Sequence, residues 1–177
     1  MPTILTHPAV PIAIATALGR NIIPKRLLFA GVVASVLPDL DVLAFRFGIS
    51  YAEDFGHRGF SHSIFFAFIV AIAGARFFRY LGSSYLRAFL FLFVATVSHG
   101  ILDAFTNGGL GIAFLWPWSS ERFFAPVQVI EVAPLGLSRF LSQKGVAVLL
   151  SELVWVWLPF MGIAVAAVFA RRQSSNR

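Results

Sequence analysis

The sequence predicts an all-α fold: one integral membrane domain over residues 1–177, built as a helical bundle of four to five apolar segments. Of the 177 residues, 58% are hydrophobic and 12% are charged, whereas soluble domains contain about 25% charged residues. The apolar residues form continuous runs, not the apolar and polar alternation of a membrane β-barrel. These observations exclude an ordinary soluble domain and favour helices that face lipid.

The first two apolar segments, residues 8–19 and 27–38, are short compared with the roughly 20 residues that cross a bilayer. The second can lengthen past Asp39 and Asp41 toward Phe47. Both are therefore either half-buried helices packed on the others or short spans in a locally thinned bilayer.

Three further segments, residues 60–75, 88–102 and 153–170, are predicted membrane helices. Each of the first two contains a single ionisable residue, a histidine, and the third contains none. Such continuous apolar stretches are typical of transmembrane helices.

Basic residues predict the orientation of the bundle. With five spans, nine Arg and Lys residues and no acidic residue fall on one side of the membrane, in the first turn, the third turn and the tail. The positive-inside rule places this side, with the carboxyl terminus, in the cytoplasm and the amino terminus outside. The nine residues are Arg20, Lys25, Arg26, Arg76, Arg79, Arg87, Arg171, Arg172 and Arg177.

The net charge of +6 and the isoelectric point near 10.8 would suggest nucleic acid as the partner of a soluble protein. Here the basic residues mark the ends of apolar segments, so we expect the lipid bilayer as partner and no nucleic acid. Cysteine is absent, which excludes disulfides and Cys-based zinc or iron–sulfur sites.

Seven histidine and aspartate residues are predicted to converge at the outer (periplasmic) face. In isolation, each is more simply interpreted as a core, interfacial or solvated residue. Together, imidazoles and carboxylates at membrane depth indicate a functional site and are the donors that a divalent metal needs. Zinc is favoured, manganese is the alternative, and one or two ions fit this number of donors. The residues are His7, Asp39, Asp41, His57, His62, His99 and Asp103.

Local spacing supports this metal site. His99 and Asp103 are four residues apart in a predicted helix, so they share one face. Asp39 and Asp41 would diverge on a continuous helix, but Pro38 favours an extended or turned chain, in which residues i and i+2 share a side. The alternative for this PDLD stretch is a helix-ending turn with solvated acids.

The segment GHRGFSHS, residues 56–63, is the most specific stretch. Gly56 and Gly59 permit a tight loop. Ser61 is expected to cap the following helix, with His62 in its first turn, so that both histidines face a common point. Arg58 is predicted to clamp an anionic substrate group, or alternatively to contact a lipid headgroup.

For two acidic residues in the last third of the chain, the sequence predicts no specific role. Glu131 is either an extra ligand or, more simply, a solvated loop acid. Glu152 lies at the outer start of the last apolar stretch, where the sequence assigns it no role.

The chain resembles the LexA-regulated, membrane-bound metal-dependent hydrolase family of bacterial inner-membrane proteins. The resemblance rests on THPAV, LPDLDVL, GHRGFSHS, SHGILDAFTNGG and LWPWSSERF, and runs to about Phe124. It implies a multi-pass protein of the bacterial inner (plasma) membrane that binds metal through the seven residues above. That family is similar in motif style to zinc-dependent phospholipase C and related nucleases, which hydrolyse phosphodiesters with His and Asp clusters.

The predicted function is therefore a metal-dependent hydrolase acting on a lipid-linked or amphiphilic substrate, with a phosphoester as first choice. Asp39 or Asp41 completes the metal shell or accepts a proton from water, and Arg58 meets the developing negative charge. The alternative is a non-enzymatic metal-binding membrane protein, with a structural ion or a transport role. The sequence leaves the oligomeric state, the metal and the bond cleaved open.

Overall fold

The structure, a computed structural model, describes residues 1–134 and 140–175, so Arg177 of the predicted basic set lies outside them. No strand forms in these ranges, only two isolated bridges, and the prediction of an all-α fold is confirmed. The helices are α1 (Ala9–Leu18), α2 (Lys25–Val36), the 3-10 helices η1 (Leu37–Phe47) and η2 (Phe60–His62), α3 (Ile64–Ala75), α4 (Tyr85–Ala104), α6 (Gln143–Glu152), the π-helical turn η3 (Leu153–Trp157) and α7 (Leu158–Ser175).

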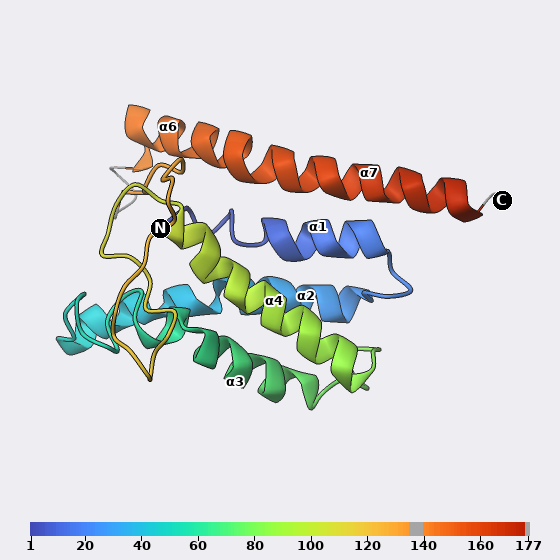
Figure 1. Cartoon of the computed structure of the whole chain (residues 1–177), viewed down its shortest axis with the longest axis horizontal. Helices are drawn as coiled ribbons and strands as arrows, with labels where there is room; N and C mark the ends of the chain where they lie inside the picture. Colours follow the sequence, from blue (N-terminus) through green and yellow to red (C-terminus); the bar gives the residue numbers. More distant parts are fainter. Residues whose placement is uncertain (135–139, 176–177) are drawn as a thin grey trace.

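Helix α4 is the centre of the bundle, and it packs against α2 and α3. Helices α6, η3 and α7 follow one another as a long rod that lies along α1 (Figure 1). The long loops gather at one end of the molecule, together with the amino terminus. The short turns between α1 and α2 and between α3 and α4 lie at the other end, with the carboxyl terminus.

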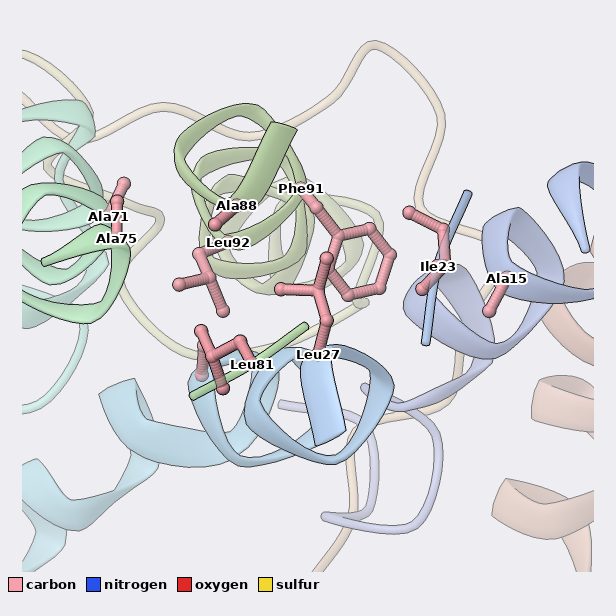
Figure 2. Close-up of a cluster of buried hydrophobic side chains, with 10 residues drawn as sticks. Ala15, Ile23, Leu27, Ala71, Ala75, Leu81, Ala88, Phe91 and Leu92 are labelled. Atoms are coloured by element: carbon pink, nitrogen blue, oxygen red, sulfur yellow. The ribbon is translucent and has the colours of Figure 1, made fainter. Parts of the chain in front are cut away.

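Small residues let the helices approach closely in the core. Ala71 and Ala75 of α3 face Ala88 and Leu92 of α4, and Phe91 fills the space next to Leu27 of α2 (Figure 2). Small residues at helix contacts are typical of membrane bundles, in which packing rather than the exclusion of water drives association.

Gly31 of α2 tests this packing. A Cβ atom at this position would collide with the Phe91 ring, so we expect Gly31→Ala to lower the free energy of unfolding by about 1 to 3 kcal/mol, as overpacked cores do. The measurement is thermal or denaturant unfolding in detergent. Gly162→Ala is the matched control, because no atom lies within 4 Å of the added methyl group. Equal stability of the two variants would contradict the packing described here.

Three helical stretches are long and apolar enough to cross a membrane: Lys25–Phe47, Tyr85–Ala104 and Gln143–Ser174. The second apolar segment thus does lengthen to Phe47, as its sequence allowed. The third is shorter than predicted: α3 begins at Ile64 because the Ser63 hydroxyl accepts the Phe66 amide and caps the helix there. Helices α1 and α3 are both below spanning length.

Among the described residues, the basic side chains expected on one side of the membrane lie at one end of the bundle. Arg26 at the start of α2 donates to the Tyr80 carbonyl in the turn after α3. Arg171 of α7 donates to the Ala17 carbonyl at the end of α1. These contacts bring the first turn, the third turn and the tail together. The number of membrane crossings and their direction stay predictions.

Candidate metal centre

The seven predicted site residues lie together at the loop end of the bundle. Each one has a side-chain contact with at least one of the others. They come from the segment before α1, from η1, from the loop that leads into η2, from η2 itself and from the C-terminal half of α4. The fold therefore joins residues that are up to 96 positions apart in the sequence, His7 and Asp103.

Four of these residues form a compact group with buried ligand atoms within 4.8 Å of one another: Asp39, His62, His99 and Asp103. The Nε2 atom of His99 lies 3.0 Å from His62 Nε2 and 3.3 Å from Asp39 Oδ1. His62 Nε2 is 3.5 Å from Asp103 Oδ2. Nitrogen and oxygen ligands about 2.0–2.1 Å from a tetrahedral zinc ion are separated by roughly 3.3 Å, so this spacing suits a metal.

His7 adds a fifth donor to this group. Its Nε2 atom lies 3.6 Å from Asp39 Oδ2 and 3.7 Å from Asp103 Oδ1. The ring stacks on that of His99 with 3.6 Å between centroids, and the residue is fully buried. The group therefore offers three imidazoles and two carboxylates to one point.

Unpaired polar atoms show that these donors fit a cation. Within the described residues, both ring nitrogens of His7 and all carboxylate oxygens of Asp39 and Asp103 are buried without a hydrogen bond. Asp103 has an ion-pair contact to Arg58 Nε at 3.1 Å. An unsatisfied buried polar group costs about 1–3 kcal/mol, and a divalent metal with nitrogen and oxygen ligands would satisfy this set.

The hydrogen bonds at the back of the histidines orient their rings. His99 Nδ1 lies 2.7 Å from the Ser35 carbonyl oxygen, to which it must donate, so its Nε2 presents a lone pair to the group. His62 Nδ1 lies 3.2 Å from Asp41 Oδ2. Carboxylates and carbonyls behind metal-binding histidines are typical of zinc sites.

Asp41 sits behind the group and joins two histidines. Its Oδ1 atom is 2.6 Å from His57 Nδ1, and its Oδ2 atom accepts from the Ser61 hydroxyl and the Arg58 amide. Asp41, His57 and His62 also form a second group of possible ligands within 4.8 Å. In this arrangement Asp41 and His57 face the compact group through His62.

The expectation that Asp39 and Asp41 share a side of an extended stretch is wrong. Residues 37–47 form the 3-10 helix η1, which has three residues per turn, so positions i and i+2 point in different directions. Asp39 therefore faces His62 Nε2 and Asp41 faces His62 Nδ1. The two carboxylates contact opposite sides of one imidazole.

The loop of residues 56–63 also differs in detail from the prediction. Gly56 and Gly59 are needed for close backbone approach, since a Cβ atom would collide with the carbonyl oxygens of Ser50 and Asp54, while the positive φ of 65° belongs to Arg58. The expected cap at Ser61 is wrong: Ser63 caps α3, and His62 lies in η2 before the helix.

Arg58 is fully buried, and its guanidinium is bound by protein groups. Besides the contact to Asp103, its terminal nitrogens donate to the Gly108 carbonyl at 2.7 Å and to the Thr106 hydroxyl at 2.8 Å. The structure thus places Arg58 where it positions Asp103. Its predicted contact with a substrate anion stays a prediction.

Two of the histidines outside the long helices, His7 and His62, differ in protonation. Burial lowers the pKa of His7 to about 3, so its imidazole is neutral and available as a donor. Burial also opposes charge on His62, but hydrogen bonds to Asp103 and Asp41 outweigh it and raise its pKa to about 9. A metal ligand must be deprotonated, so a proton and a metal compete for His62.

Sequence reasoning missed the groups that support the centre. Ser35 contributes a backbone carbonyl, for which a side-chain pattern carries no signal. Thr106 lies in the SHGILDAFTNGG stretch, and its contact with Arg58 depends on how two loops meet. Of the acidic residues with less specific readings, Glu131 is not part of either ligand group among the described residues.

The chain is similar in sequence to known inner membrane proteins. The profile of the YdjM inner membrane protein family matches residues 1–174. Inner membrane protein YbcI of Escherichia coli (strain K12) is 54% identical over 165 residues, which cover 91% of this chain and 94% of that protein. No solved structure matches the chain. These names support the inner membrane as location but mention no hydrolase, LexA or phospholipase C, so those similarities stay predictions.

Proposed function

We propose that this chain, which belongs to the YdjM inner membrane protein family, is a membrane-bound metal-dependent hydrolase. The observation that carries the proposal is the set of buried atoms of His7, Asp39 and Asp103 that lack a hydrogen bond among the described residues and lie beside the Nε2 atoms of His62 and His99. Such a concentration of donors in an apolar bundle favours a site that binds a divalent metal.

The residues that would hold the metal are His7, Asp39, His62, His99 and Asp103. Zinc is the first choice and manganese the second, because the donors are nitrogen and oxygen without sulfur. A divalent metal here would lower the pKa of a water molecule toward neutrality and stabilise negative charge on a phosphoryl oxygen. Arg58 keeps Asp103 in place, and Asp41 and Ser35 orient the imidazoles of His62 and His99.

The exposure of the side chains in the centre suggests which residues transfer protons. The side chains of Asp39, Asp41 and His57 are 4%, 6% and 5% exposed, whereas those of His7 and Asp103 are fully buried. In this proposal the His57–Asp41 pair accepts a proton from the ligand group through His62, which lies between them.

Apolar side chains near this edge favour an amphiphilic substrate. Leu40 and Leu43 of η1 are 55% and 49% exposed, and Phe47 and Trp118 are 82% and 78% exposed. Exposed aromatic and aliphatic residues at the end of a membrane bundle are typical of the lipid interface. A lipid-linked phosphoester would then present its headgroup to the centre while its chains stay in the bilayer.

A chelation experiment tests the proposal. Protein purified in detergent and loaded with zinc or manganese should hydrolyse a phospholipid or a phosphodiester, should lose this activity after treatment with a chelator, and should regain it when metal is restored. Metal binding without hydrolysis of any phosphoester, amide or carboxylic ester would support the second candidate below.

A structural ion is the second candidate function. It is favoured by the five donors, because a site filled by protein ligands leaves no position for water. The number of water molecules bound to the metal separates the two functions: a hydrolase requires at least one, and a purely structural site requires none. A metal-free purified protein that does not take up zinc or manganese would contradict both.

A further inference from the structure

Glu152 is a buried carboxylate in an otherwise lipid-facing helix. It ends α6 within the stretch Gln143–Ser174, in which only 11% of the most apolar window is buried, yet Glu152 is 2% exposed. An ionisable group at this depth is unfavourable unless it has partners and a role. Neither group of possible metal ligands among the described residues includes it, so Glu152 is not assigned as a ligand.

The partners of Glu152 are all in the amino-terminal segment. Its carboxylate accepts the backbone amide of Thr3, the Thr3 hydroxyl at 2.8 Å and the Thr6 hydroxyl at 2.7 Å. Hydrogen bonds to an ionised acceptor are stronger than neutral ones. Three of them hold a short segment that directly precedes His7.

His7 is held differently from three of the other donors, and from Asp39, which also lacks a hydrogen bond in the described part of the chain but is fixed within the helix η1. His62 has Asp41 behind its ring, His99 has the Ser35 carbonyl, and Asp103 has Arg58. Both ring nitrogens of His7 lack a hydrogen bond within the described residues. Apart from stacking on His99, its place depends on the backbone that carries it.

That backbone is tied to Glu152 by a short path. The Thr6 amide donates to the Thr3 carbonyl at 2.9 Å, and the Ala9 amide donates to the Thr6 carbonyl at 3.0 Å. These bonds form a turn that carries His7 from the Glu152 contacts into α1. Further along the rod, Val156 packs in one buried cluster with Ala9 and Val10, so the rod holds both sides of His7.

We propose that Glu152 is a positioning residue that holds His7 in the metal centre from the far side of the amino-terminal segment. The inference rests on the proposed metal centre and adds the C-terminal rod to it. The rod, through Glu152 at the end of α6, is required to complete the ligand set, although it contributes no ligand. Loss of the Glu152 contacts should release His7, while His62, His99 and Asp103 keep their own partners and Asp39 keeps its place in η1.

Cobalt(II) is the probe for this role, because its visible spectrum reports the number and geometry of its ligands. In Glu152→Gln, we expect cobalt affinity to fall at least about tenfold, in the range seen when residues behind a metal ligand are changed. The spectrum should shift to that of His7→Ala. Glu131→Gln is the matched control: it removes one acidic charge at the same end of the chain and should bind cobalt like the wild type.

A double-mutant cycle separates positioning from a general loss of stability. If Glu152 acts through His7, the variant His7→Ala/Glu152→Gln should bind cobalt no more weakly than His7→Ala alone. Thr6→Val, which removes one of the three hydrogen bonds, should give a smaller loss and serves if Glu152→Gln does not fold. Additive losses in the cycle, or a Glu152→Gln spectrum like that of the wild type, would overturn the proposal.

Cobalt binding by the wild-type protein shows whether a negative result contradicts the positioning role of Glu152 alone or the metal centre as a whole. If wild-type protein binds no cobalt, the proposed function fails, and the positioning role fails with it. If wild-type protein binds cobalt and the Glu152 variants bind it equally well, only the role of Glu152 is overturned. Hydrogen exchange of the peptide covering residues 1–10 adds a readout without metal, and it should speed up in Glu152→Gln but not in Glu131→Gln.

Discussion

The His99→Ala variant is expected to insert into the membrane and to purify without its metal. His99 lies at the middle of the compact group, with its Nε2 atom 3.0 Å from His62 and 3.3 Å from Asp39. Its loss removes one donor and the ring on which His7 stacks. The apolar segments that direct insertion are unchanged, so the yield in the membrane fraction should stay close to that of the wild type.

Elemental analysis by plasma mass spectrometry measures this result. Wild-type protein, cleared of adventitious ions and of any affinity tag, should contain one or two equivalents of zinc or manganese, and His99→Ala should contain less than about a tenth of that amount. Ile101→Ala is the matched control, because Ile101 lies on the same helix with its side chain 45% exposed. Unchanged metal content in both His99→Ala and His62→Ala would refute the ligand assignment.

Arg58→Met is expected to destabilise the protein more than any single change outside the ligands. The guanidinium is fully buried and contacts Asp103 at 3.1 Å. Removing one partner of a buried ion pair leaves an uncompensated charge and costs about 3–5 kcal/mol. The free energy of unfolding, measured with a denaturant in mixed micelles, should fall by that amount in metal-free protein.

Two further variants show whether the loss of stability comes from the uncompensated charge of Asp103. Arg46→Met removes an exposed arginine and should leave the stability unchanged. In the double variant Arg58→Met/Asp103→Asn, the buried charge is gone, so part of the lost stability should return although metal binding does not. If Arg58→Met instead leaves stability intact and only weakens substrate binding, Arg58 acts on the substrate, as its sequence context first suggested.

The structure also explains why a bundle with so few charged residues keeps so many of them buried at one end. Asp39, Asp103 and Glu152 are all buried, each on a helix with the length and composition of a membrane span. Two of them face the metal centre, and the third holds the segment that carries His7. Each of these three buried carboxylates therefore contacts a protein group or faces the proposed metal, as ionisable groups at membrane depth require.

The sequence by itself determined the class of fold and predicted which histidines and aspartates lie together at the loop end of the bundle. In a bilayer, the backbone N–H and C=O groups of a continuous apolar segment find no hydrogen-bond partner in the lipid. Such a segment therefore forms a helix, in which these groups bond to one another. The four-residue spacing of His99 and Asp103 predicted that both lie on one helix face. The other histidines and aspartates lie at ends of apolar segments that the predicted topology puts at one end of the bundle. These conclusions depend on periodicity and on local chemistry.

Only the tertiary structure decided how these residues divide their roles. Asp39 and Asp41 are two positions apart, yet the 3-10 geometry of η1 turns one toward the ligand group and the other behind His62. Glu152 and Thr3 are 149 positions apart and meet because the C-terminal rod packs along α1. Such roles depend on contacts between distant segments, and a distant contact has no period or spacing from which one sequence can predict it.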